Sequence, residues 1–516
     1  MISLETAFSD SRRFSRLAPP AKDDNQARRS NLTLFPSLQE SEISMGRMRF
    51  LAPRRERIPA EALERAYVAG LDGIPTPCRK TWDQNGILAV GRDLDESSRF
   101  YVPWSISGEQ TLASTTSLME REEPYLLEVE LARGAVYRLR EQADSWLTAG
   151  LQIPAELTEQ IRLATGGFIE AATSQQTPET AADTAQEVLE DCRQAVESLT
   201  AEYIRQVLEI RRAQTPQLPV RLGGGMGSEP MPENLQPMFS AAFHAALTPF
   251  SWRSVQPAPD RWDWSLADQQ IAYCRQHQLK IFGGPLLCLE PEFFPQWVLD
   301  SSPDYDTLMQ LLQAYWGNTA QRYRNDAHLW IVASGLNVPG CLPLNDEQRL
   351  RLTVAALEKV HRTDSRTPLM VGVSQPWGEY MAHQNTDLPP LHYAETLARA
   401  DLGLCGLGLE FPWGYWPGAL PRDLLEVSHL LDVWSLLGLP LVLQVAGPAD
   451  DGDAQKEWLE KTVPLFLAKQ AVQSVLWSQP FDAQPQAFPA GGLFDSQNKP
   501  KPALSTLLAI RREHLA

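Results

Sequence analysis

The sequence predicts an α/β protein whose carboxyl-terminal part, residues 221–516, forms a (β/α)8 barrel. Eight short apolar runs in this part alternate with stretches that have apolar residues at helical spacing, and a barrel of this kind needs eight strands. Residues 46–135 show short apolar or alternating runs between Gly, Pro, Asp and Ser, a pattern typical of an antiparallel sandwich-like domain. Residues 136–220 have apolar residues three and four apart, which indicates a helical connector.

The composition and net charge of the chain exclude several classes of partner and of binding site. The 516 residues are 43% hydrophobic, enough for several domains with buried cores. The net charge of −18 argues against a nucleic-acid or anionic-membrane partner and leaves a neutral ligand, such as a carbohydrate, open. Six scattered Cys without a CxxC motif, and His residues without metal-ligand spacing, lead us to expect no disulfide framework, metal or cofactor. No apolar run approaches the ~20 residues of a membrane span.

Residues 1–45 are expected to be a disordered extension, because they are polar and contain Pro. They carry basic residues but no apolar core of a signal peptide, so we expect a cytoplasmic protein. Met45 and Met48 open the first stretch with an ordered pattern. The sequence is therefore also compatible with translation that starts at either of these residues.

The sandwich-like domain is expected to have strands at residues 48–53, 86–91, 99–106 and 124–134. Trp82 and Trp104 make it a candidate carbohydrate-binding module, although core positions in a sandwich would explain both residues as well. In the connector, the spacing predicts helices over residues 154–172 and 180–213, the second with Thr180 or Asp183 as its N-cap.

The barrel strands are expected within eight apolar runs, namely residues 221–226, 245–250, 280–288, 329–336, 369–374, 402–411, 439–447 and 474–481. The clearest helices between them are expected at residues 265–278, 305–323, 345–362 and 453–470. A doubly wound open sheet is the alternative. The glycines Gly223-Gly224-Gly225 lack the spacing of a dinucleotide-binding loop, so the barrel is favoured.

Residues 240–516 resemble glycoside hydrolase family 10, the endo-1,4-β-xylanase family. The similar segments are Thr248-Pro249, Trp252, Val255-Gln256-Pro257, Trp262-Asp263-Trp264, Leu437 to Pro440, Val475-Leu476-Trp477, Gly492 to Asp495 and Lys499 to Pro502. The resemblance implies a barrel that acts on a β-linked polysaccharide through two carboxylates, an acid/base ending strand four and a nucleophile ending strand seven.

Both expected carboxylates are replaced in this chain. Ser334-Gly335 stands where the family has Asn-Glu at strand four, and shifting the match to Asn337 brings Val338 to the Glu position. Gln444 lies in strand seven, where the family has its nucleophile. The sequence therefore leaves open a divergent glycoside hydrolase and a non-catalytic carbohydrate-binding or scaffold pseudoenzyme. A third hypothesis is an interaction protein that binds its partner through the sandwich and the long helix.

Three remaining acids are candidate catalytic residues, because they follow strands whose carboxyl ends gather at the barrel mouth. Glu290 follows strand three, Glu379 follows strand five and Glu410 ends strand six. Glu410 is preferred, since nearby aromatic rings would raise its pKa and suit it to donate a proton. A structural acid that is paired with loop amides or an Arg is the competing interpretation for each.

Candidate substrate-binding residues surround these acids. Flat rings at strand ends and in loops can stack on sugar faces, and the candidates are Trp377, Trp413, Trp416 and Trp477, together with the polar side chains of Gln444 and Asn337. We expect Glu410 to lie within reach of Trp413, Trp416 or Trp477.

Overall fold

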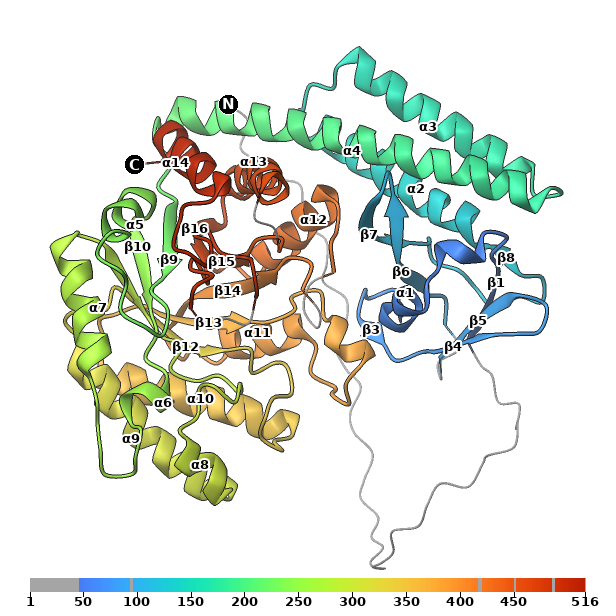
Figure 1. The fold of residues 1–516 in the computed structure, drawn as a ribbon. Helices are drawn as coiled ribbons and strands as arrows, with labels where there is room; N and C mark the ends of the chain where they lie inside the picture. The colour runs from blue at the N-terminus through green and yellow to red at the C-terminus, as the bar shows by residue number, and fades with distance from the viewer. Residues whose placement is uncertain (1–45, 93–95, 416–419, 450–451, 485–487, 516) are drawn as a thin grey trace, which may run out of the picture. The chain divides into compact units, whose positions relative to one another are not determined.

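The computed structural model describes residues 46–92, 96–415, 420–449, 452–484 and 488–515. Residues 1–45, for which the sequence predicts disorder, and Trp416 lie outside this description. Along the chain, two small sheets come first, three long helices follow, and a closed barrel completes the fold (Figure 1). The predicted fold class is confirmed.

The two amino-terminal sheets have four strands each and share one core. Their orders are β4-β5-β1-β8 and β3-β2-β6-β7. The strands are β1 (Arg47–Leu51), β2 (Tyr67–Ala69), β3 (Pro75–Thr76), β4 (Arg79–Trp82), β5 (Ile87–Gly91), β6 (Arg99–Ile106), β7 (Glu109–Ser114) and β8 (Tyr125–Leu126). Phe50 of β1 stacks on Phe100 of β6 with ring centroids 5.3 Å apart, so the sheets pack face to face. Two short helices, η1 (Arg55–Arg57) and α1 (Ala60–Arg65), follow β1. Trp104 is buried in this core, while Trp82 lies beneath the Arg55 guanidinium.

Three helices follow the sheets: α2 (Leu127–Thr148), α3 (Ala155–Thr173) and α4 (Pro178–Gln214). The strand predicted over residues 124–134 is wrong after Leu126, because α2 begins at Leu127. Leu127 and Leu131 are four residues apart and both fully buried, as one face of a helix requires. The predicted N-cap of the long helix is also wrong, because α4 begins at Pro178, a residue whose fixed φ suits the first helical turn. Asp183 instead pairs with Arg54 and Arg57.

The eight parallel strands of the carboxyl-terminal part close in the order β10-β11-β12-β13-β14-β15-β16-β9. They are β9 (Arg221–Gly225), β10 (Ala245–Thr248), β11 (Lys280–Gly283), β12 (Leu329–Ser334), β13 (Leu369–Val373), β14 (Leu404–Pro412), β15 (Leu441–Ala446) and β16 (Val472–Trp477). All but β14 and β16 lie entirely within the predicted apolar runs, and those two extend one or two residues beyond them. The interior below the mouth is filled by a small cluster of apolar side chains that includes Leu247, Ile331, Met370 and Leu476.

Helices connect these strands, and the four predicted with most certainty are present. The helices are α5 (Gln236–Ala242), α6 (Trp252–Val255), α7 (Ser265–Gln276), α8 (Gln296–Ser301), α9 (Tyr305–Tyr323), α10 (Asp346–Thr363), η2 (Glu379–Ala382), α11 (Pro390–Arg399), α12 (Leu424–Ser435), α13 (Asp453–Ala468) and α14 (Pro502–His514). No helix among the described residues combines the length and the apolar character needed to cross a membrane.

Two glycines in helices give a test of how α2 packs on the second sheet. A Cβ at Gly134 of α2 would overlap the Ser114 carbonyl oxygen of β7, whereas a Cβ at the exposed Gly166 of α3 would have no atom within 4 Å. We expect Gly134→Ala to lower the free energy of unfolding by about 1–3 kcal/mol, because the helix must shift. Gly166→Ala should raise it by roughly 0.5–1 kcal/mol through the higher helix propensity of Ala. Urea unfolding of both variants measures the difference, and equal stability would show that α2 and β7 are not packed as described.

Candidate functional site at the carboxyl ends of the barrel strands

Glu410 lies near the end of β14, and two serine hydroxyls, one after the adjacent β13 and one from β12 beyond it, hold its carboxylate. Ser334, which ends β12, donates to Oε1, and Ser374, which follows β13, donates to Oε2. The Glu410 side chain is half-buried. Taking a carboxylate out of water is costly unless donors replace the lost water, and the two hydroxyls do this on one oxygen each.

Glycines create the space in which these polar groups meet. A Cβ at Gly372 of β13 would overlap the Ser334 hydroxyl and lie 3.2 Å from Glu410 Oε1. A Cβ at Gly408, two residues before Glu410 on the same face of β14, would lie 3.0 Å from Gln444 Nε2. Because larger residues at either position would crowd the polar side chains, the Gly-rich sequence of these strands is part of the site.

Asn337 acts on the site through Ser374. Its Nδ2 donates to the Ser374 carbonyl oxygen at 2.8 Å, and its Oδ1 accepts from the Ser374 backbone N–H at 3.1 Å. Asn337 is fully buried, so it fixes the backbone that presents the Ser374 hydroxyl. Gln444 is Glu410's register partner on β15 and is 8% exposed; its Nε2 has no hydrogen-bond partner among the described residues.

Glu290, in the loop after β11, is close enough to Glu410 for their negative charges to interact. Burial among surrounding atoms raises its pKa above the ordinary carboxyl value, and the negative charges of Glu410 and Glu292 raise it further. The neighbouring Cys288 thiol also has a raised pKa, mainly through burial, with contributions from Glu290 and Glu410. The side chain of Glu290 nevertheless keeps an exposed surface. The carboxylates after strands three and six therefore share one electrostatic environment.

Glu379, the third candidate acid, has different partners. It is 1% exposed and pairs through Oε1 with Arg422 Nη2 at 2.6 Å, while its Oε2 accepts from the Leu420 N–H at 3.3 Å. Arg422 also donates to the Tyr67 hydroxyl of β2 at 3.0 Å and lies over the Trp377 ring at 4.1 Å. These contacts join the barrel to the second amino-terminal sheet and do not include Glu410. They match the competing interpretation of Glu379 as a structural acid that is paired with loop amides or an Arg.

Three of the tryptophans predicted to bind sugar lie within the described residues, and each of them has protein partners. Trp477 is 2% exposed, and its indole N–H donates to the Gly491 carbonyl at 3.0 Å. Trp377 meets Phe411 edge to face at 5.4 Å, and Trp413 packs against Trp458 at 5.6 Å. The described hydrogen-bond partners of Glu410 are the two serines, and its expected proximity to a tryptophan ring stays a prediction.

Sequence reasoning missed Ser334 and Ser374 as functional candidates. A signal was present, because a Ser follows directly after the apolar stretches 329–333 and 369–373 of strands four and five, much as Glu410 follows the apolar stretch of strand six. Among the described residues, no group of three or more His, Cys, Asp and Glu side chains is arranged to hold a metal.

No protein-family model and no curated protein matches the chain. Similar solved structures are family 10 xylanases. Xylanase 10B from Thermotoga petrophila RKU-1, solved with xylobiose, is 14% identical with a TM-score of 0.46, over 57% of this chain and 94% of that one. Xylanase 10B from Thermotoga maritima is 14% identical with a TM-score of 0.47, over 58% and 97%. The family 10 protein from Paenibacillus barcinonensis is 17% identical with a TM-score of 0.46, over 58% and 97%. At TM-scores below 0.5 this likeness carries no argument, and the barrel assignment rests on the chain's own strand pairing.

The raised pKa of Glu290 predicts a pH-dependent effect on stability. Because this pKa is higher in the folded chain than in the unfolded chain, raising the pH above about 4.5 ionises the unfolded state first and lowers the free energy of unfolding. Glu290→Gln removes that loss, so its Tm should exceed that of the wild type at pH 7 and match it at pH 4. In a Glu410→Gln background the gain should shrink, because one of the nearby charges is gone. Thermal unfolding at both pH values tests this, and an equal gain at pH 4 and pH 7 would contradict it.

The buried ion pair of Glu379 makes a separate prediction. Arg422→Met should lower the free energy of unfolding by about 3–5 kcal/mol, because it leaves the Glu379 carboxylate buried without its partner. The double variant with Glu379→Gln should recover part of this loss. Arg362→Met is the matched control, since its pair with Glu358 at 3.3 Å is exposed and should contribute about 0.5 kcal/mol or less. Denaturant unfolding that gave the same loss for both arginines would refute the role of Arg422.

Proposed function

We propose that the carboxyl end of the barrel binds a β-linked oligosaccharide, and that Glu410 and Glu290 are the acidic pair that hydrolyses it. The observation that carries the proposal is the Glu410 carboxylate, held by serine hydroxyls from two adjacent strands and electrostatically coupled to Glu290. A half-buried carboxylate with dedicated hydroxyl partners at the carboxyl end of a barrel strand is typical of an active site rather than of a stabilising contact.

The two carboxyl groups have environments suited to different roles. Hydrolysis of a glycosidic bond needs one protonated carboxyl that donates to the leaving oxygen and one carboxylate that attacks, activates water or stabilises positive charge. Glu290, whose pKa is raised, suits the acid. Glu410, which accepts two hydroxyl hydrogen bonds, suits the carboxylate instead of the proton donor that the sequence led us to expect. Their strands are three apart around the barrel, so a sugar lying across the mouth would contact both.

This arrangement differs from the one that the family resemblance implies. Gly335, or Val338 in the shifted match, takes the acid/base position of strand four, and Gln444 lies where strand seven should carry the nucleophile. None of these side chains can replace a carboxylate in those steps, so the chemistry would have moved to the ends of strands three and six. The same substitutions favour the second candidate function, a barrel that binds carbohydrate without cleaving it.

Hydrolysis of aryl β-glycosides and β-1,4-linked oligosaccharides, xylo-oligosaccharides included, tests the proposal. Glu410→Gln should lower kcat by roughly 10²–10⁴, the usual contribution of a positioned carboxyl group. Glu290→Gln should lower kcat similarly with a leaving group that needs protonation, and much less with an activated aryl leaving group. Glu358→Gln, an exposed carboxylate on the surface of α10, is the matched control and should retain the wild-type rate.

The outcomes separate the hypotheses. Turnover that survives Glu410→Gln would refute the assigned pair. Oligosaccharide binding measured by calorimetry without any turnover would establish the non-catalytic binding protein. The absence of both binding and turnover would reject a carbohydrate function and favour the interaction-protein hypothesis.

A further inference from the structure

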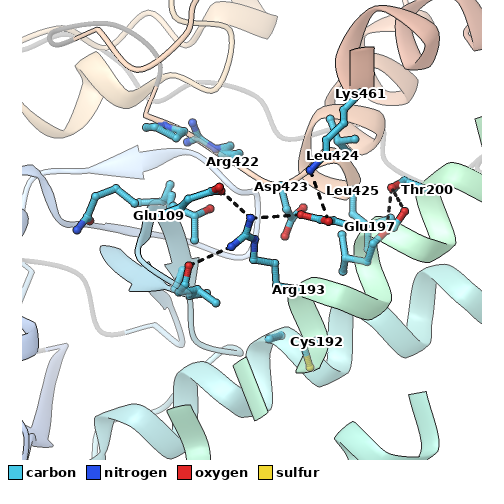
Figure 2. Close-up of a pocket in the computed structure, with 18 of the residues that line it drawn as sticks. Glu109, Cys192, Arg193, Glu197, Thr200, Arg422, Asp423, Leu424, Leu425 and Lys461 are labelled. Carbon is cyan, nitrogen blue, oxygen red and sulfur yellow. Dashed lines mark hydrogen bonds and ion pairs between the residues drawn. The ribbon is translucent and has the colours of Figure 1, made fainter. Parts of the chain in front are cut away.

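A second site lies away from the barrel mouth. A cavity of about 350 Å³ forms where β7, α2 and α4 meet the β14–α12 loop and α13 (Figure 2). Among the described residues, its lining includes none of the four polar groups at the mouth, which are Glu290, Ser334, Ser374 and Glu410. The cavity therefore belongs to a different part of the molecule from the site of the proposed function.

The inner wall of the cavity is apolar. The aliphatic residues that line it come from β6, β7, α2, α4, α12 and α13, and they include Leu112, Leu131, Leu189, Val196, Leu424 and Leu425. Cys192 of α4 lies among them, and burial raises the pKa of its thiol to about 12, so the group is uncharged at neutral pH. A ligand that enters this space exchanges water for hydrocarbon contacts, which favours an apolar molecule.

Charged side chains at one edge of the cavity neutralise each other. Arg193 Nη2 lies 2.7 Å from Glu109 Oε2 and 3.3 Å from Glu197 Oε1. The second oxygen of Glu197 lies 3.6 Å from Lys461 Nζ. Figure 2 shows this chain of ion pairs running from β7 through α4 to α13. Because every link is a pair of opposite charges, this edge carries little net charge.

The other two cations of the lining are also paired. Arg138 Nε lies 3.1 Å from Glu426 Oε1, and its Nη2 lies 3.8 Å from Asp423 Oδ2. Arg422 forms the buried pair with Glu379. All four cations that line the cavity thus have carboxylate partners. An anionic ligand would have to displace one of these carboxylates, so an uncharged ligand is favoured over an anion.

Two aromatic rings complete the wall. Trp413 and Trp458 lie with ring centroids 5.6 Å apart and planes tilted by 53°, and both line the cavity. Indole rings offer a large apolar face to a ring or chain of a ligand.

We propose that this cavity binds a small, uncharged and mainly apolar molecule. Its volume lies at the lower end of the roughly 300–1,000 Å³ of ligand pockets, which limits the occupant to a compact compound. The proposal does not depend on the proposed carbohydrate function, and its test uses no carbohydrate.

A pair of fluorescent probes tests both the place and the charge preference. N-phenyl-1-naphthylamine is neutral, and 1-anilinonaphthalene-8-sulfonate has the same ring framework with an added sulfonate. The full-length protein should bind the neutral probe saturably with one site per chain. Binding of the sulfonate at this site should be at least tenfold weaker, because every lining cation is already paired.

Variants that fill the cavity locate the probe. Ala135→Phe on α2 and Thr111→Phe on β7 each add a ring to a different element of the lining, and each should weaken binding of the neutral probe at least tenfold. Ser145→Phe, which adds the same ring to an exposed position of α2, is the matched control and should bind like the wild type. Circular dichroism and thermal unfolding establish that each variant is folded, and having two filling variants keeps the test valid if one of them is not.

Three results would overturn the proposal. They are an absence of saturable binding to the wild type, unchanged affinity in folded Ala135→Phe and Thr111→Phe, and equal affinity for the sulfonated probe at a site that both variants block. Loss of probe binding in the two filling variants alone, with the neutral probe preferred in the wild type, supports it.

Discussion

The pairing of β16 with β9 closes the barrel, and the site at its mouth depends on that closure. An open sheet would leave the backbone groups of both strands unpaired at its edges, and it would not gather the ends of strands three to six into one ring. Gly223 of β9 makes the closure compatible with a filled interior, since a Cβ there would overlap the Leu476 side chain of β16. The polar groups around Glu410 then lie above an apolar plug rather than over a channel.

A second constraint acts at the side of the barrel, where Arg422 joins Glu379, Tyr67 and the Trp377 ring. Arg422 and Glu379 are each almost completely buried, so both charges have lost their water and depend on each other. The backbone carries the same junction further, because the Leu112 N–H of β7 donates to the Pro421 carbonyl at 2.8 Å. Residues 420–423, which lead from Glu410's strand to α12, are thereby fixed to the second sheet. For this reason the cavity of Figure 2 is lined both by the amino-terminal part of the chain and by the barrel.

Local sequence predicts the strands well because each is a continuous apolar run, which a strand buried on both faces requires. It fails at residues 127–134, where Leu127, Val129 and Leu131 alternate as in a strand although tertiary packing makes them a helix. The candidate acids show the same limit, since Glu290, Glu379 and Glu410 all follow strands and look alike in sequence. Their difference comes from partners far along the chain, with Arg422 43 residues after Glu379 and Ser334 76 residues before Glu410.

The mouth and the cavity share β14, since Glu410 lies on that strand and Trp413 follows directly after it. Coupling between the two would require a ligand to prefer one of two arrangements of this strand. β14 pairs with β15 from Leu407 as far as Pro412 and with β13 up to Leu409, and the Trp413 N–H donates to the Ala446 carbonyl at 3.0 Å. Moving Glu410 would therefore break ladders on both sides of the strand. A ligand beside Trp413 would make no new contact that offsets the loss of these hydrogen bonds. We therefore expect a ligand at one site to leave the affinity of the other site unchanged.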